Sequence, residues 1–335
     1  MFASRFVPRK WVVVLFLLGA SVFSLSWVRL TFPADADYPN RPISMNVGLP
    51  AGGTTSLMAE MFRDVAKGYL PKSQPLLIEY KPGAAQAIAA DFVFKQPADG
   101  YNLLFAEAGV CAKMALDGDK LRFKIEDFAF AGVTGSSLTA LVVKKDSPLQ
   151  TFEEFMSYAK KNPGKLSYGH SGIGGGTNLS FERFKMKCGL DVNGIPLGGG
   201  AAYIAGVLGG HVDCIIGAVG NLGDHIIPGG GLKALAIFAR DRWTGLPDVP
   251  TCIEKGYDVE LSSYTFLAAK KGTPQAVMAI WKDVVKKTCN DARWKESLVK
   301  AKFVPTYLGP EDTERKAHEE FQTARDVFKK MGLLK

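Results

Sequence analysis

The sequence predicts an α/β protein of two lobes, each with a mostly parallel sheet flanked by helices, and a ligand cleft between the lobes. Three observations lead to this fold class. Short apolar runs alternate with helix-like segments along most of the chain, which is typical of such sheets. The 335-residue length fits two domains after an N-terminal segment of different composition. Finally, two glycine-rich turns each join a strand-like run to helix-like sequence.

The first 36 residues have the organisation of an export signal. Three basic residues lie within the first ten positions, an apolar run covers 11–27, and Ala34-Asp35-Ala36 forms a small-x-small site before Asp37. This order predicts a cleaved signal peptide. An uncleaved membrane anchor remains the alternative, because the apolar run approaches the length that crosses a bilayer.

The charge and the cysteine pattern exclude several classes of protein. The net charge is +8, and residues 1–36 hold four basic and one acidic residue, so the remainder carries +5. Lysines and acids alternate through 282–302 and 311–330, which is typical of solvated helix faces, so we expect no nucleic-acid partner. The five cysteines lack CxxC spacing and the four histidines lack paired ligand spacing, so we expect no metal and no cofactor.

The first lobe is predicted from strand-like and helix-like runs in alternation. In chain order these are residues 44–49, 57–69, 76–80, 85–95 and 103–106. The order β-α-β-α-β predicts that ligands approach the carboxyl ends of the strands.

A second series of elements predicts the second lobe. It comprises residues 139–143, 152–161, 166–169, 179–187, 192–196, 202–208, 214–218 and 232–238. A turn-rich segment at 244–251, an apolar run at 264–269 and helices at 274–289 and 311–331 complete the chain. We expect this tail to pack on the first lobe, so that two connections form a hinge. Lobe 1 then comprises 37–140 with 264–335, and lobe 2 comprises 141–263.

The first glycine-rich turn follows the strand-like run 44–49. Its candidate ligand-binding residues are Ala51, Gly52, Gly53, Thr54, Thr55 and Ser56. Because glycine has no Cβ, a ligand can approach the backbone N–H groups closely, and the start of a helix adds positive partial charge. This combination predicts a site for a small anion.

The second turn follows the strand-like run 166–169 and has the same character. Its candidate residues are His170, Ser171, Gly172, Gly174, Gly175, Thr177 and Asn178. The glycine spacing matches a dinucleotide fingerprint poorly, and no acidic residue ends the next strand-like run. Two such turns, one in each lobe, predict an anion held between the lobes.

Further candidates flank these turns. Glu107 follows the strand that ends at Ala106 and can reach the cleft, and Gly198 follows another strand-like run. Ser171 beside His170 permits a different class of function, an exported α/β enzyme with Ser171 as nucleophile. The chain has no G-x-S-x-G elbow, and a base adjacent in sequence seldom has the required geometry, so we expect no catalytic residues.

Several short motifs resemble one family, the extracytoplasmic solute receptors of tripartite tricarboxylate transporters, also called the Bug family. They run from about Tyr38 to the C-terminus. The motifs are Tyr38-Pro39, Arg41-Pro42-Ile43, Pro50-Ala51-Gly52-Gly53, Lys81-Pro82-Gly83-Ala84, Pro97-Ala98-Asp99-Gly100-Tyr101, Tyr168-Gly169, Ser171-Gly172-Ile173-Gly174, Gly209-Gly210-His211-Val212-Asp213, Leu246-Pro247-Asp248-Val249-Pro250-Thr251 and Gly272-Thr273-Pro274.

The resemblance implies a type II periplasmic-binding-protein fold that closes on a small carboxylate-bearing solute. It implies a periplasmic location and membrane permease subunits as partners. The family's ligand loops correspond to Ala51, Gly52 and Gly53 and to Ser171, Gly172 and Gly174. A receptor that reports occupancy to a sensor protein is the alternative within the same fold.

The chain departs from the family pattern at several of these positions. The family usually has acidic residues where this chain has Ser56 and Gly217, and Asn where it has Tyr80. The usual Ser and His of the second loop are Gly175 and Asn178 here. We therefore expect an anion without a charged amine, with Tyr80 near an aromatic or larger carboxylate.

Overall fold

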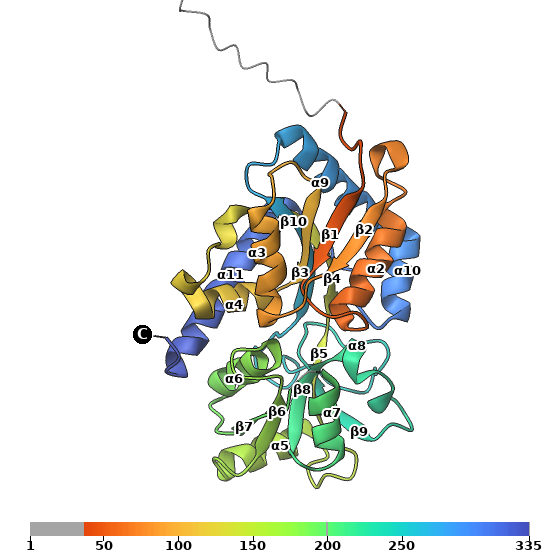
Figure 1. Cartoon of the computed structure of the whole chain (residues 1–335). Coiled ribbons are helices and arrows are strands. Elements are labelled where there is room, and N and C mark those ends of the chain that lie inside the picture. Colours follow the sequence, from red (N-terminus) through yellow and green to blue (C-terminus); the bar gives the residue numbers. More distant parts are fainter. Residues whose placement is uncertain (1–36, 199, 335) are drawn as a thin grey trace, which may run out of the picture. The chain divides into compact units, whose positions relative to one another are not determined.

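The computed structural model describes residues 37–198 and 200–334 (Figure 1). The predicted export signal lies outside the described residues. Within the described part of the chain, no helix combines the length and the apolar character that a membrane span requires. The described fold contains two five-stranded sheets, and we call each sheet with its helices a lobe.

The first sheet has the strand order β2-β1-β3-β10-β4. Its strands are β1 (Ile43–Val47), β2 (Leu76–Tyr80), β3 (Asn102–Glu107), β4 (Phe128–Ser137) and β10 (Ser263–Lys270). Strand β1 pairs in parallel with β2 and β3, whereas β10 runs antiparallel to both β3 and β4. One antiparallel strand therefore interrupts the mostly parallel sheet that the sequence predicts.

Helices cover both faces of this sheet. One face carries α2 (Thr54–Ala66), α9 (Gln275–Asn290) and α10 (Ala292–Lys300), and the other carries α3 (Ala87–Lys95), α4 (Gly109–Asp117) and α11 (Pro310–Lys330). Strand β3 shows why both faces are apolar. Its Leu103 and Phe105 pack under α2, whereas Leu104 and Ala106 pack under α3 and α4, because successive strand side chains point to opposite faces.

The second sheet has the order β7-β6-β8-β5-β9. Its strands are β5 (Thr139–Lys144), β6 (Ser167–His170), β7 (Asn193–Pro196), β8 (Cys214–Ala218) and β9 (Leu232–Ile237). Here β5 is the antiparallel strand, paired with β8 and β9. Helices α5 (Phe152–Lys161) and α6 (Gly176–Cys188) cover one face, and α7 (Gly200–Leu208) and the short α8 (Val219–Leu222) cover the other.

Local sequence explains where α5 begins. The Thr151 hydroxyl accepts a hydrogen bond from the Glu154 N–H, and the Glu154 carboxylate accepts one from the Thr151 N–H. This capping box satisfies two backbone donors that would otherwise have no helical partner. The helix then buries Phe152, Phe155 and Met156 in the second lobe.

The sequence analysis did not predict three of the elements: α4, β4 and the separate helix α10. Strand β4 contains Gly132 and Gly135, which a pattern of apolar alternation does not favour as strand residues. Tertiary packing explains both glycines. A Cβ on Gly132 would lie 2.9 Å from the Leu308 carbonyl oxygen, and a Cβ on Gly135 would lie 2.6 Å from the Met58 side chain.

The chain passes between the lobes at two neighbouring places. Leu138 separates β4 from β5, and the segment before β10 returns to the first sheet. The Thr139 hydroxyl donates to the Leu261 carbonyl oxygen at 2.5 Å, so the two crossings are held together. These crossings lie within two residues of the expected boundaries at 140/141 and 263/264, and the lobe boundaries stay a prediction.

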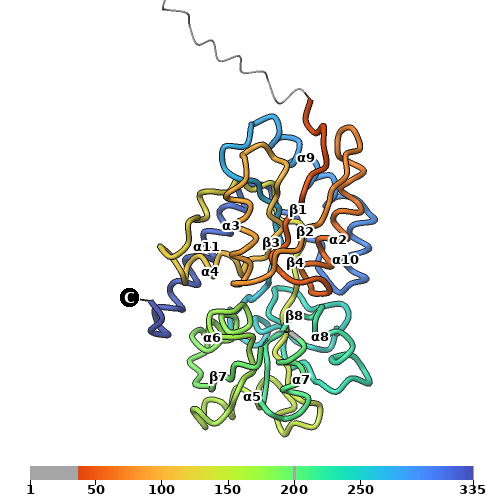
Figure 2. Tube along the Cα trace, viewed as in Figure 1, coloured from red at the N-terminus to blue at the C-terminus, as the bar shows by residue number. Residues whose placement is uncertain are grey.

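The last helix contacts both lobes. Figure 2 shows α11 running along α4 on the first lobe, with its C-terminal end beside α6 of the second. Phe328 and Val327 of α11 pack with Ala112 and Ala115 of α4 and with Leu179 of α6. The tail therefore forms an apolar contact between the lobes as well as covering the first sheet.

Candidate functional site

A cavity of about 140 Å³ lies between the lobes, beside the two crossings. The first lobe lines it with Thr54, Glu107, Ala108 and Gly109, and the second lobe lines it with residues from α6, α7, β8 and α8. It is the hollow to which both predicted glycine-rich turns contribute residues, and we therefore take it as the candidate site.

The first turn presents the start of α2 to this cavity. Gly53 is the extended N-cap residue, and Thr54 at the first helical position lines the cavity. The Ser56 hydroxyl donates back to the Gly53 carbonyl oxygen at 2.8 Å. The N–H groups of a first helical turn have no partner within the helix, so they form an electropositive group of donors.

The second turn presents the start of α6 in the same way. Gly175 is the N-cap residue, and Gly176 and Thr177 line the cavity. The first turn of α6 contains no acidic residue, and neither does that of α2. Nothing in either first turn therefore neutralises the positive end of these helices.

A third helix start, that of α4, was missed by the sequence reasoning. Ala108 and Gly109 line the cavity immediately after β3 ends at Glu107. The signal available was the small-residue pair Ala108-Gly109 directly after a buried strand. Three helix N-termini, two from the first lobe and one from the second, thus meet at one cavity.

Four amides of the second turn are engaged within the turn itself. Ser171 N–H donates to Thr177 Oγ1 at 2.9 Å, and Gly172 N–H donates to His170 Nδ1 at 3.1 Å. Gly174 N–H donates to Asn178 Oδ1 at 2.9 Å, and Gly175 N–H donates to the Gly172 carbonyl oxygen at 3.1 Å. The donors that reach the cavity from this turn are therefore those at the start of α6.

Two of the predicted site residues support the turn from inside the second lobe. His170 and Asn178 are both buried, and burial lowers the pKa of His170, which keeps the imidazole neutral as the acceptor for Gly172. The Asn178 amide donates to the Tyr168 hydroxyl at 2.7 Å, which in turn donates to Glu182 at 2.7 Å. This buried chain of hydrogen bonds fixes the turn.

Of the residues predicted from the sequence, Thr54, Glu107 and Thr177 line the cavity. The remaining residues of the two turns surround the helix starts and do not line it: Ala51, Gly52, Gly53, Thr55, Ser56, His170, Ser171, Gly172, Gly174, Gly175 and Asn178. Ala106 is fully buried in the first lobe, and Gly198 lies exposed after β7. Their roles in binding stay predictions.

Tyr80 lies apart from the cavity. Its hydroxyl donates to the Glu60 carboxylate, its ring packs against the core under α2, and burial raises its pKa to about 12. Tyr80 does not line this cavity, and its contact with a solute stays a prediction.

The second lobe, the crossings and α11 of the first lobe supply polar residues that the sequence did not single out. They are Ser137, Thr139, Ser180, Arg183, Tyr203, Asn221, Ser262, Ser263 and Glu320. The Thr54 hydroxyl donates to the Asn221 side-chain oxygen, so a hydrogen bond joins the two lobes at the cavity. Arg183 and Glu320 form an ion pair, and hydroxyl groups make up most of the other polar lining.

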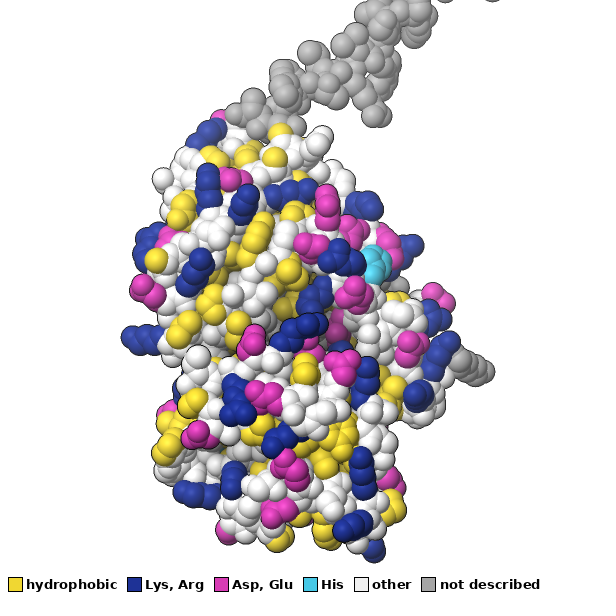
Figure 3. All heavy atoms as spheres, turned by 180° about the vertical axis from the view of Figure 1, so that it is seen from behind, with side chains coloured by type: hydrophobic (Ala, Val, Ile, Leu, Met, Phe, Trp, Pro, Cys, Tyr) yellow, Lys and Arg dark blue, Asp and Glu magenta, His cyan; other side chains and the backbone are white. Residues whose placement is uncertain are grey.

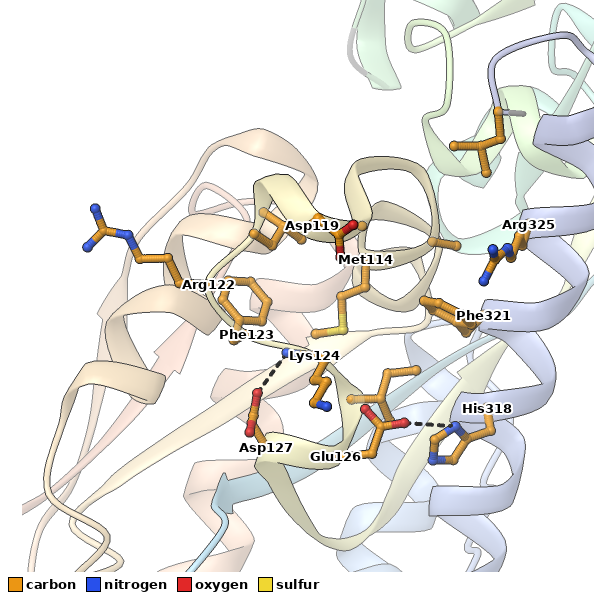
Figure 4. Close-up of a pocket in the computed structure, with 15 residues that line it drawn as sticks. Met114, Asp119, Arg122, Phe123, Lys124, Glu126, Asp127, His318, Phe321 and Arg325 are labelled. Carbon is orange, nitrogen blue, oxygen red and sulfur yellow. Dashed lines mark hydrogen bonds and ion pairs between the residues drawn. The ribbon is translucent and has the colours of Figure 1, made fainter.

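Larger hollows lie elsewhere, among them two that contain none of the predicted site residues. One, of about 430 Å³, lies on the first lobe between α4 and α11 (Figure 4). In this hollow the Lys124 backbone N–H donates to Asp127, and His318 lies 3.8 Å from Glu126. The other, of about 680 Å³, lies near the crossings and includes Trp243 and Phe303.

Charges are mixed on the surface of both lobes. Figure 3 shows lysine and arginine side chains interspersed with acidic ones over the face opposite to that of Figure 1. No uniformly basic stripe is visible on that face. At the candidate cavity, the groups suited to an anion are instead the helix N-termini.

The sequence model of the family described as "Tripartite tricarboxylate transporter family receptor" (TctC) matches residues 61–333. The chain belongs to this family. Protein BugT of Bordetella pertussis is 29% identical over 320 residues, which cover 94% of this chain and 97% of BugT. The family resemblance expected from the motifs is thus confirmed.

Solved structures of TctC-like proteins share the fold. A structure described as a periplasmic transporter matches with a TM-score of 0.78 and 29% identity, covering 89% of this chain and 99% of that one. R. palustris Rpa4515 with adipate matches with a TM-score of 0.77 and 26% identity, covering 88% and 99%. The predicted two-lobed periplasmic-binding-protein fold is therefore confirmed, with one antiparallel strand in each sheet.

Proposed function

We propose that this TctC-family protein captures a small carboxylate-bearing anion in the cavity between its lobes and delivers it to the membrane permease subunits of a tripartite tricarboxylate-type transporter. The observation that carries the proposal is the meeting of three helix N-termini, from α2, α4 and α6, at one cavity. Unpaired N–H donors and aligned peptide dipoles favour a negative group at such a place.

The rest of the lining suits the same solute. Thr54, Thr177, Ser180 and Tyr203 offer hydroxyl groups, and a carboxylate accepts several hydrogen bonds at once. Waters can bridge the remaining distances in a cavity of this size. The Rpa4515 relative, whose structure is described as containing adipate, supports a carboxylate as the solute class.

Closure of the lobes would couple binding to transport. Both lobes contribute donors, so a solute gains its full set of contacts only when the lobes are together, and binding favours that state. The hydrogen bond between Thr54 and Asn221 joins the lobes at the cavity. A permease can then recognise the closed arrangement of the lobe surfaces.

We also propose that the protein is exported, with residues 1–36 as signal peptide or anchor, and that it works in the periplasm. The lobes comprise residues 37–140 with 264–335, and 141–263. The receptor has no catalytic step. The Ser171 hydroxyl lies 2.9 Å from the Thr177 hydroxyl, and His170 Nδ1 accepts from Gly172 N–H rather than from Ser171.

Calorimetric titration of the purified protein tests the proposal directly. The probes are succinate, adipate, benzoate and aspartate, and we expect binding of plain carboxylates with a rise in thermal midpoint. Replacement of Thr177 by Val should weaken binding, since it removes a cavity hydroxyl and the acceptor for Ser171 N–H, whereas Tyr158→Phe on the exposed face of α5 should not. Absence of binding and of any thermal shift for every probe would contradict the carboxylate receptor.

A further inference from the structure

Glu107 is an acid in a cavity that we assign to an anion. It ends β3, directly before the start of α4, and it is only partly exposed. Its Oε2 accepts a hydrogen bond from the Thr55 hydroxyl at 3.0 Å, and its N–H donates to the buried Gln86 side chain at 3.1 Å. Its Oε1 lies beside Gly109, where an added Cβ would be 3.5 Å away.

Within residues 37–198 and 200–334, no cation balances the Glu107 carboxyl group. Among the residues that the structure describes, Glu107 forms no ion pair, and the charged residues that line the cavity with it are Arg183 and Glu320. Those two pair with each other at 3.2 Å. The lining therefore has a net charge of −1 when Glu107 is ionised and zero when it is protonated.

The groups around Glu107 do not change this balance. Arg183 on α6, Tyr203 on α7 and Glu320 on α11 line the cavity with it, and Cys111 on α4 and Tyr264 on β10 are buried in neighbouring elements. Elsewhere on α4 and α6, Lys113 pairs with Asp117 and Lys185 pairs with Glu182. Burial raises the pKa values of Cys111, Tyr203 and Tyr264, so these three are neutral near pH 7. Burial also raises the pKa of Glu107, against a smaller lowering by the Thr55 hydrogen bond.

Two carboxylates that share a small site cannot both ionise without strong repulsion. A solute carboxylate placed at the helix N-termini lies in the same 140 Å³ cavity as Glu107. The repulsion between the two carboxylates is removed if Glu107 takes a proton from solvent when the solute binds. A solute ammonium group would relieve it too, but that cation would face the donor ends of three helices.

We propose that Glu107 determines solute specificity by binding as a neutral carboxylic acid that donates its proton in a hydrogen bond to the solute carboxylate. This inference rests on the proposed carboxylate-receptor function. It implies that, at pH values where Glu107 of the free protein is ionised, one proton enters the protein with each solute and leaves with it. It also selects against zwitterionic amino acids, because a neutral Glu107 offers no charge to an ammonium group.

Titration calorimetry in buffers of different ionisation enthalpy measures the proton directly. For succinate or adipate at pH values above the pKa of free Glu107, we expect uptake of about one proton per solute and a Kd that rises about tenfold per pH unit. In Glu107→Gln, whose amide still donates a hydrogen bond, binding should persist without proton uptake and with a flat pH profile. Glu314→Gln, an exposed acid on α11, should behave as the wild type.

Several outcomes would overturn the inference while leaving the receptor function intact. They are a wild-type Kd that is independent of pH above the pKa of free Glu107, proton uptake that survives in Glu107→Gln, or aspartate binding that exceeds succinate binding and disappears in Glu107→Gln. The last result would assign an ionised Glu107 to an ammonium group.

A measurement without solute keeps the inference testable if no probe binds. The carboxyl carbon of Glu107, assigned by its loss in Glu107→Gln, can be titrated by NMR in the free protein. We expect a pKa above the ordinary value for glutamate. A pKa at or below that value would overturn the inference, whereas failure of all probes to bind would count against the receptor function alone.

Discussion

Arg183 on α6 and Glu320 on α11 form an ion pair across the lobes, with Nη1 3.2 Å from Oε2. Both side chains are mostly buried, at 25% and 16% exposure, and both line the candidate cavity. The pair therefore stabilises the contact between α11 and the second lobe, and it removes net charge from the cavity wall.

A double-mutant cycle tests this pair. We expect Arg183→Met and Glu320→Gln to be coupled by about 1 kcal/mol in the free energy of unfolding, since a partly buried pair is weakly screened by solvent. Urea unfolding of the two single variants and the double variant measures the coupling. A matched cycle on the exposed pair of Lys287 and Asp283 should give a smaller value, and equal coupling in both cycles would contradict the prediction.

Phe328 lies fully buried in the apolar cluster between α4, α6 and α11. Phe328→Ala should lower the free energy of unfolding by about 3 to 5 kcal/mol, because it removes a large buried side chain and leaves a cavity. Leu333→Ala, at a position 39% exposed, is the control and should cost about 0.5 kcal/mol or less. Similar losses for both variants, measured by urea unfolding, would argue against a packed cluster at this place.

His170 predicts a pH dependence of stability. Because burial lowers its folded-state pKa, the unfolded chain takes up the proton first as the pH falls below about 6.5. Stability should therefore decrease from that pH downward, until the folded-state pKa is passed. His170→Asn keeps an acceptor for Gly172 N–H and removes the titration. In unfolding experiments, the free energy of unfolding of the variant should depend less on pH in this range than that of the wild type. An equal slope in both proteins would refute the prediction.

The Tyr168 hydroxyl joins two partners, Asn178 and Glu182. Tyr168→Phe should cost about 1 to 3 kcal/mol, because it leaves the buried Asn178 amide with an unsatisfied donor. Tyr158→Phe, at a position 41% exposed, should change stability by about 0.5 kcal/mol or less. Thermal unfolding compares the stability of the two variants. The loss of stability in Tyr168→Phe should be accompanied by faster hydrogen exchange at the Gly174 amide. A Tyr168→Phe protein as stable as the control would show that this chain of hydrogen bonds contributes little.

Sequence reasoning performed best where local pattern decides structure. The succession of an apolar run, a glycine-rich turn and helix-like sequence predicted both α2 and α6, because each of these features depends only on residues close together in the chain. It failed for β4, whose Gly132 and Gly135 are explained by atoms of Leu308 and Met58 far away in the chain. The expected place of Tyr80 near the solute stays a prediction; in the structure its hydroxyl bonds with Glu60.

The sequence by itself determined the family, the two-lobed α/β architecture and the two turns that begin α2 and α6, since these follow from short-range patterns. Only the tertiary structure decided that both helix starts, together with that of α4, face one cavity. It also decided that Glu107 lies there with no ion pair among the described residues, while Arg183 is neutralised by Glu320, 137 residues further along the chain. Such pairings arise from the packing of one lobe against the other, which leaves no local record in the sequence.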